Sequence, residues 1–120
     1  MNEPASVTVE ARGSTLWVSL RGEMDMSNAE GIEGTLRDQI EQGVDRVVID
    51  LSQLVFIDSS GVRVLLALGS RFRERRRELI LVVPDAGIVR RVLSVSGVDA
   101  IVAVVADPAD IPADDPAGGP

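Results

Sequence analysis

Hydrophobic and polar residues alternate in two stretches near the start of the chain. Residues 6 to 11 and residues 15 to 21 each place apolar side chains at every second position, and Arg12-Gly13-Ser14 separates the two stretches. A period of two is typical of β-strands that bury one face, and a short break containing glycine is typical of a β-hairpin. The pattern therefore predicts that the domain opens with a hairpin.

The pattern changes to a helical period after this hairpin. A short acidic loop over residues 22 to 26 leads to Ser27, which with Glu30 has the spacing of a capping box, and Gly43 fits the end of a helix. Between them, apolar side chains recur every three or four positions, at Ala29, Ile32, Leu36 and Ile40. The spacing predicts a helix over about residues 28 to 42.

Strand and helix patterns alternate over the remainder. Residues 46 to 51 are β-branched and nearly continuous in apolar character, which is typical of a central strand covered on both faces. This alternation predicts an α/β domain, with a mixed sheet of four to five strands and helices packed against it. The further elements that we expect are an apolar stretch at 54 to 57, a buried helix after residue 58, a strand over 79 to 83, a helix that begins at Pro84-Asp85 and ends at Ser96-Gly97, and a strand over 100 to 105.

Length and charge divide the chain into one domain and a tail. At 120 residues, of which 45% are hydrophobic, the chain has the size of a single domain, which we place at residues 5 to 106. The last fourteen residues, 107 to 120, contain four Asp, four Pro and no basic residue. We expect this acidic segment to be disordered, and without its four carboxylates the net charge of −7 falls to about −3.

Cysteine, histidine and lysine are all missing from the chain, and their absence excludes several kinds of chemistry. The chain has no cysteine and no histidine, which removes disulfides and the Ser-His-Asp and Cys-His forms of catalysis. All twelve basic residues are arginine, so a P-loop or a Schiff base cannot be built. With no signal peptide and no apolar run long enough for a membrane, we expect a cytoplasmic protein that is not an enzyme and uses no metal or other cofactor.

The segment Phe56-Ile57-Asp58-Ser59-Ser60-Gly61-Val62 joins an apolar strand to an apolar helix. The free N–H groups at the start of a helix need acceptors, and Asp58, Ser59 or Ser60 could supply one as a cap worth ~1 kcal/mol. Capping needs only one of the three. The second interpretation is that a serine is exposed and accepts a phosphoryl group, which the helix dipole tolerates and which would affect a docked partner rather than the fold.

Three segments together resemble a known family. Gly22-Glu23-Met24-Asp25, the segment from Phe56 to Val62, and Ser96-Gly97-Val98 stand in the same order in the bacterial anti-sigma factor antagonists, which are STAS domains, and the resemblance covers about residues 5 to 105. It implies a protein that binds an anti-sigma factor serine kinase and so frees a sigma factor for transcription. In that family the kinase phosphorylates the first serine after the aspartate, the antagonist then releases its partner, and a serine phosphatase restores it.

Carried onto this sequence, the resemblance makes Ser59 the phosphorylated residue. It also implies that the neighbouring side chains contact the partner, namely Glu23, Asp25, Asp58, Ser60, Gly61, Val62 and Arg63. The last of these departs from the family, which often has glycine at that position, so the identity of the partner is open. Because the chain has no histidine or lysine to act as a base, the kinase must supply the catalytic groups, the nucleotide and the magnesium ion.

Other interpretations of the same residues compete with this one. The domain could be a fixed scaffold in a larger signalling or transport assembly, with Ser59 never modified. Alternatively, Asp58 or Asp50 could accept the phosphoryl group, although the missing lysine argues against it. We expect the acidic residues before the first helix to serve its dipole rather than a metal ion, and the arginines of residues 71 to 77 to form a solvated helix end rather than a nucleic-acid site.

Overall fold

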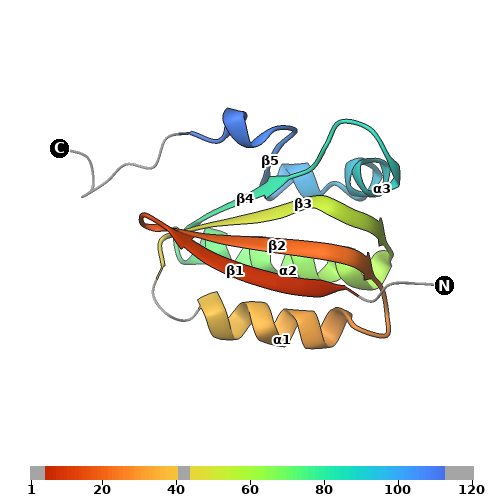
Figure 1. Cartoon of the computed structure of the whole chain (residues 1–120), viewed down its shortest axis with the longest axis horizontal. Helices are drawn as coiled ribbons and strands as arrows, with labels where there is room; N and C mark the ends of the chain where they lie inside the picture. Colours follow the sequence, from red (N-terminus) through yellow and green to blue (C-terminus); the bar gives the residue numbers. More distant parts are fainter. Residues whose placement is uncertain (1–4, 41–43, 113–120) are drawn as a thin grey trace.

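A five-stranded mixed sheet forms the centre of the molecule (Figure 1). The computed structural model describes residues 5–40 and 44–112. The order across the sheet follows the sequence; the first two strands are antiparallel and every later neighbour is parallel. This architecture confirms the predicted α/β domain. The strands are β1 Ser6–Arg12, β2 Thr15–Met24, β3 Arg46–Ile57, β4 Glu78–Val82 and β5 Ala103–Val105.

Within residues 5–40 and 44–112, three α-helices and one short 3-10 helix connect the strands, and a second 3-10 helix follows the last strand. The α-helices are α1 Ala29–Ile40, α2 Ser59–Glu74 and α3 Ile88–Ser96, and the 3-10 helices are η1 Val98–Ala100 and η2 Pro108–Asp110. Their apolar faces share one core with alternate residues of the sheet, such as Ile49 and Leu81, which are fully buried. Successive residues of β3 and β4 point to opposite faces of the sheet, so every second one faces the helices.

The other face of the sheet carries a smaller apolar cluster. Val48, Ile80 and Val82 are buried there, and residues of β2, β5 and the C-terminal segment pack against them, including Trp17 and Ile111. Figure 1 shows that the C-terminal segment lies on the opposite side of the sheet from α1. Both faces of β3 and β4 are thus covered, as the nearly continuous apolar run at residues 46 to 51 predicted.

Several element boundaries differ from those expected from the sequence. The predicted acidic loop at 22 to 26 is largely strand, because β2 continues to Met24 alongside β3, and β3 itself extends through the apolar stretch at 54 to 57. The predicted last strand is shorter, since η1 occupies residues 98–100 and β5 begins at Ala103. Pairing with a neighbouring strand, which the local pattern does not encode, sets these limits.

The helix caps also differ in part. α3 begins at Ile88 after Gly87, whose positive φ of 106° suits glycine, and no side chain caps it; Asp85 instead lies 3.8 Å from Arg90 in an ion pair. Its predicted end is confirmed, because Gly97 stands in the left-handed conformation. The predicted end of α1 at residue 43 lies outside the described residues.

Part of the predicted acidic tail belongs to the folded chain. Asp107 accepts a hydrogen bond from the Ala109 N–H at 2.8 Å and so caps η2, and Ile111 packs on the second apolar cluster. The guanidinium of Arg46, on the strand beneath, donates to the carbonyl oxygen of Pro112 at 2.6 Å. The domain therefore continues past the expected boundary at residue 106 as far as residue 112, where the description ends.

α2 packs closely against the segment after η1, and the contact is made at Gly69. A Cβ atom added there would overlap the side chain of Val102, so we expect Gly69→Ala to lower the free energy of unfolding by about 1–3 kcal/mol through overpacking. Gly31→Ala, in α1, is the matched control, because nothing lies within 4 Å of its added Cβ and alanine favours a helix by up to about 1 kcal/mol. Urea unfolding followed by the fluorescence of Trp17 measures both. Equal stability of the Gly69→Ala variant and the parent would contradict this contact.

Candidate functional site

Asp58 caps the N-terminus of α2. It follows the end of β3 with an extended backbone, and one oxygen of its carboxylate accepts hydrogen bonds from the N–H groups of Ser60 and Gly61, at 2.8 and 3.3 Å. These are two of the donors that a helix start leaves without a partner, and a carboxylate is also favoured there by the helix dipole. Of the three capping residues left open by the sequence, the structure selects Asp58.

The second oxygen of the same carboxylate holds a different loop. It accepts a hydrogen bond from the backbone N–H of Met26 at 3.1 Å, and the backbone N–H of Asp58 donates to the carbonyl oxygen of Met24 at 3.2 Å. The loops that follow β2 and β3 are therefore joined at the carboxyl edge of the sheet, where adjacent parallel strands end together. This brings Glu23 and Asp25 to the same edge of the sheet as Asp58.

The loop from Asp25 to Asn28 is held by its own side chains. The Ser27 hydroxyl and the Ser27 N–H both donate to the Asp25 carboxylate, at 2.6 and 2.9 Å. Asn28 accepts from the Asp25 N–H and donates to the carbonyl oxygen of Glu23. Ser27 therefore donates its hydrogen bonds to the Asp25 carboxylate instead of forming the predicted capping box with Glu30.

These hydrogen bonds also change the acidity of Asp25. The donated Ser27 hydroxyl, and to a smaller extent the Ser27 N–H, lower the pKa of the Asp25 carboxyl below its ordinary value of 3.8. Both bonds favour the charged form, so the loop keeps a negative charge beside α2 down to more acidic pH than an isolated aspartate would.

Ser59 is the first residue of α2 and is exposed to solvent. Its hydroxyl has no hydrogen-bond partner among the residues that the structure describes, whereas the N–H groups of Ser60 and Gly61 beside it both donate to Asp58. Ser60 is half-buried and lines a groove between α1 and α2. An exposed hydroxyl without a partner, on a rigidly held helix start, is accessible to a group-transferring enzyme.

Two of the predicted partner-contacting residues lie inside the domain. Val62 is only 6% exposed and belongs to the main core. Gly61 is buried as well, and a Cβ atom there would lie 2.6 Å from Ile57 Cγ1 and 3.1 Å from Met24 Cγ. Both are therefore buried beneath Ser59, and neither presents a side chain at the surface. Arg63, one helical turn after Ser59, is exposed.

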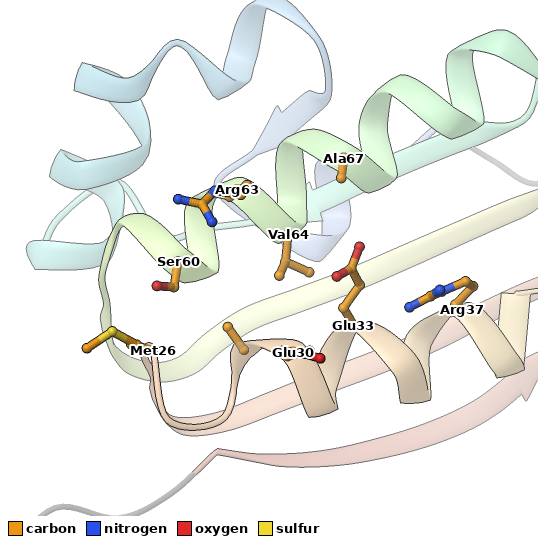
Figure 2. A pocket seen from close by; sticks show the side chains of 9 residues that line it. Met26, Glu30, Glu33, Arg37, Ser60, Arg63, Val64 and Ala67 are labelled. Carbon is orange, nitrogen blue, oxygen red and sulfur yellow. The ribbon is translucent and has the colours of Figure 1, made fainter.

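The groove beside Ser60 has a volume of about 480 Å³ (Figure 2). Met26 stands at one end, with 81% of its surface exposed. Figure 2 shows the side chains of α1 and α2 that line the groove, and charges of both signs occur among them. The sequence does not indicate this groove, because the period of each helix shows which side is buried but not which second helix lies beside it. The lining residues are Met26, Ala29, Glu30, Glu33, Arg37, Ser60, Arg63, Val64 and Ala67.

Exposed apolar side chains gather at the same end of the sheet. Besides Met26, these are Val55 and Phe56 at the end of β3 and Ile88 at the start of α3, which are 61%, 39% and 46% exposed. Single exposed apolar residues are common, but several around one edge are typical of a protein interaction surface. Among residues 5–40 and 44–112, no three acidic side chains gather in a way that could hold a metal ion, and no helix is long and apolar enough to cross a membrane.

Comparison with known proteins assigns the chain to a family. The STAS domain family matches residues 6–111, which is most of the chain, and the protein belongs to that family. A Bordetella bronchiseptica protein, BtrV, provisionally named an anti-sigma factor antagonist, is 36% identical over 75 residues. This match covers 62% of the present chain and 65% of BtrV, so the chain spans slightly less than two thirds of that relative.

Solved structures have the same fold. An anti-sigma factor antagonist from Mycobacterium paratuberculosis superposes with a TM-score of 0.77 at 24% identity, over 92% of this chain and 94% of that one. SpoIIAA, a cell fate determinant of Bacillus, superposes in its phosphorylated form with a TM-score of 0.64 at 25% identity, over 85% and 93% of the two chains. The single α/β domain is thus a STAS fold, as the resemblance implied.

The hydrogen bonds of Ser27 predict how Asp25 titrates. In Ser27→Ala the hydroxyl donor is gone, so we expect the pKa of Asp25 to rise toward its ordinary value, while Thr35→Ala, which removes a distant exposed hydroxyl on α1, leaves it unchanged. Because the folded-state pKa is lowered, this contribution to stability is complete above the unfolded value of 3.8 and is lost as the pH falls through the folded value. Carboxyl carbon NMR shifts followed against pH measure both variants; an unchanged Asp25 midpoint in Ser27→Ala would refute the assignment.

Proposed function

We propose that this protein is an anti-sigma factor antagonist that binds an anti-sigma factor serine kinase and is switched off by phosphorylation of Ser59. The observation that carries the proposal is the position of the Ser59 hydroxyl, which is exposed and without a partner among the described residues at the first position of α2. In the unphosphorylated state the antagonist occupies the kinase, and the sigma factor is free to direct transcription. The phosphorylated antagonist releases the kinase, which then captures the sigma factor.

The chemistry of the modification assigns the catalytic groups to the partner. The Ser59 oxygen attacks the γ-phosphorus of ATP, the bond from that phosphorus to the bridging oxygen breaks, ADP leaves, and the hydroxyl proton passes to a base. This chain has neither histidine nor lysine, and both oxygens of the adjacent Asp58 carboxylate already accept backbone hydrogen bonds. The kinase therefore supplies the base as well as the nucleotide and its magnesium ion.

The position of Ser59 explains why the effect falls on binding. A phosphoserine carries about −1.5 to −2 charges at pH 7, and the N-terminus of a helix is where such a charge is best tolerated. Ser59 faces solvent, so the added group displaces no core side chain. A docked partner would instead meet a new charge at the edge of the sheet where Met26, Phe56 and Ile88 expose apolar side chains.

The surface around Ser59 identifies the residues that we expect the kinase to contact. These are Glu23, Asp25, Asp58, Ser60 and Arg63, which lie at the carboxyl ends of β2 and β3 and in the first two turns of α2. Gly61 and Val62 act through packing alone. Removal of the phosphate by a serine phosphatase would restore the hydroxyl with release of inorganic phosphate. All of these steps would take place in the cytoplasm, where sigma factors act.

The relatives support this assignment. BtrV is provisionally named an anti-sigma factor antagonist, and SpoIIAA of Bacillus has been solved in a phosphorylated and in an unphosphorylated form. Both forms of SpoIIAA superpose on this chain with TM-scores of 0.64 to 0.66. Phosphorylation of a domain of this fold is therefore compatible with the architecture.

The proposal predicts a specific modification. Incubation with the serine kinases of its own cell and Mg-ATP should place one phosphoryl group on the peptide that contains Ser59, in the parent and in Ser60→Ala, but not in Ser59→Ala. In a pull-down from the same cytoplasm, Ser59→Ala should retain a kinase that Ser59→Asp releases, with at least a tenfold difference in affinity, which corresponds to about 1.4 kcal/mol. Mass spectrometry of the peptides reads out the first experiment. Equal retention by both variants, with no modification of Ser59, would instead indicate a permanent scaffold.

A further inference from the structure

Arg63 lies one helical turn after Ser59 on α2. Residues four apart on a helix are neighbours, with about 5–6 Å between their Cβ atoms, and a negative group placed before a positive one at this spacing is the favourable orientation. Arg63 is the only charged residue in the first two turns of α2, since the residues from Ser59 to Leu66 are otherwise small or apolar. A charge added at Ser59 therefore has one cation on its own helix within reach.

The guanidinium of Arg63 is available for such a contact. The side chain is exposed and forms no hydrogen bond or ion pair with any residue that the structure describes. Figure 2 shows it extending along α2 toward the first turn of the helix, as helical side chains do. Glu30 and Glu33 of α1 line the same groove, and neither forms an ion pair with Arg63.

We propose that Arg63 is a phosphate-binding residue, which pairs with the phosphoryl group once Ser59 carries it. This inference rests on the proposed function, which supplies the phosphoryl group on Ser59. It adds the residue with which that phosphoryl group pairs. Guanidinium binds phosphate oxygens through two parallel hydrogen bonds, a stronger arrangement than a single neutral bond. The pair joins two exposed residues of one rigid helix, so it forms without any rearrangement of the core.

Pairing of Arg63 with the phosphate gives phosphorylation of Ser59 a second effect on a docked partner. In the unmodified protein Arg63 is free to meet a carboxylate of a docked partner beside the Ser59 hydroxyl. After phosphorylation the same guanidinium is held by the phosphate, so the partner loses a cation at the same time as it meets an anion.

The experiment installs phosphoserine at position 59 during synthesis of the full chain, so that no kinase is needed. Phosphorus NMR then follows the second ionisation of the phosphate, near pH 6, in the parent, in Arg63→Gln and in Arg73→Gln. Loss of the cation should raise the second pKa of the phosphate, which is the midpoint of this titration, by a few tenths of a unit in Arg63→Gln. This is the size expected for a pair one turn apart. Arg73, exposed in the last turn of the same helix, is the matched control and should leave the midpoint unchanged.

A second signal separates pairing from a general charge effect. The Nε–H resonance of Arg63 should move on phosphorylation, and that of Arg73 should stay in place. All variants share the other charged groups near the phosphate, which are Asp58, Asp25, Glu30 and Glu33. Equal midpoints in the parent and Arg63→Gln, or equal shifts in both glutamine variants, would overturn the inference. Neither result depends on a cellular kinase. If no kinase modified Ser59 in the cell, the proposed function would fail in its own experiment, and the outcome of this one would not change.

Discussion

The carboxylate of Asp58 is the interaction on which the site depends. One oxygen caps α2 and the other holds the loop between β2 and α1, so a single side chain fixes two segments that lie more than thirty residues apart in the sequence. A capping carboxylate contributes about 0.5–2 kcal/mol to stability. Its larger consequence is geometric, because it fixes the backbone that carries Ser59 and keeps the neighbouring acidic loop at the same edge.

Burial divides the first turns of α2 into two sides with different tasks. Gly61 and Val62 face the core and allow the helix to lie close to the ends of β2 and β3. Ser59 and Arg63 stand on the exposed side, one turn apart. Because the helical period separates the two sets so strictly, chemistry at the exposed pair need not disturb the packing beneath it. This separation allows a regulatory charge to act on a partner while the domain stays folded.

The sequence predicts local features well and long-range features less well. A side-chain cap at the start of α2, the end of α3 at Gly97 and the nearly continuous apolar run of β3 all follow from residues close in the chain, and the structure confirms them. The bond from the Met26 N–H to Asp58 and the burial of Val62 depend on which strands pair and how α2 is turned, so local patterns could not reveal them. That the exposed serine is Ser59 was expected only from the resemblance, and the physical reason is that α2 buries Gly61 and Val62 and leaves Ser59 in solvent.

The most direct test compares two free energies of unfolding, that of the unmodified chain and that of the chain carrying phosphoserine at position 59. The comparison shows whether a charge at this site leaves the fold intact. The account predicts that urea unfolding gives values within about 1 kcal/mol of each other, because the helix dipole and an exposed cation both favour the added anion. A loss of several kcal/mol, with chemical shift changes spread through β3 and β4, would show that the phosphate acts on the fold itself and would contradict the account.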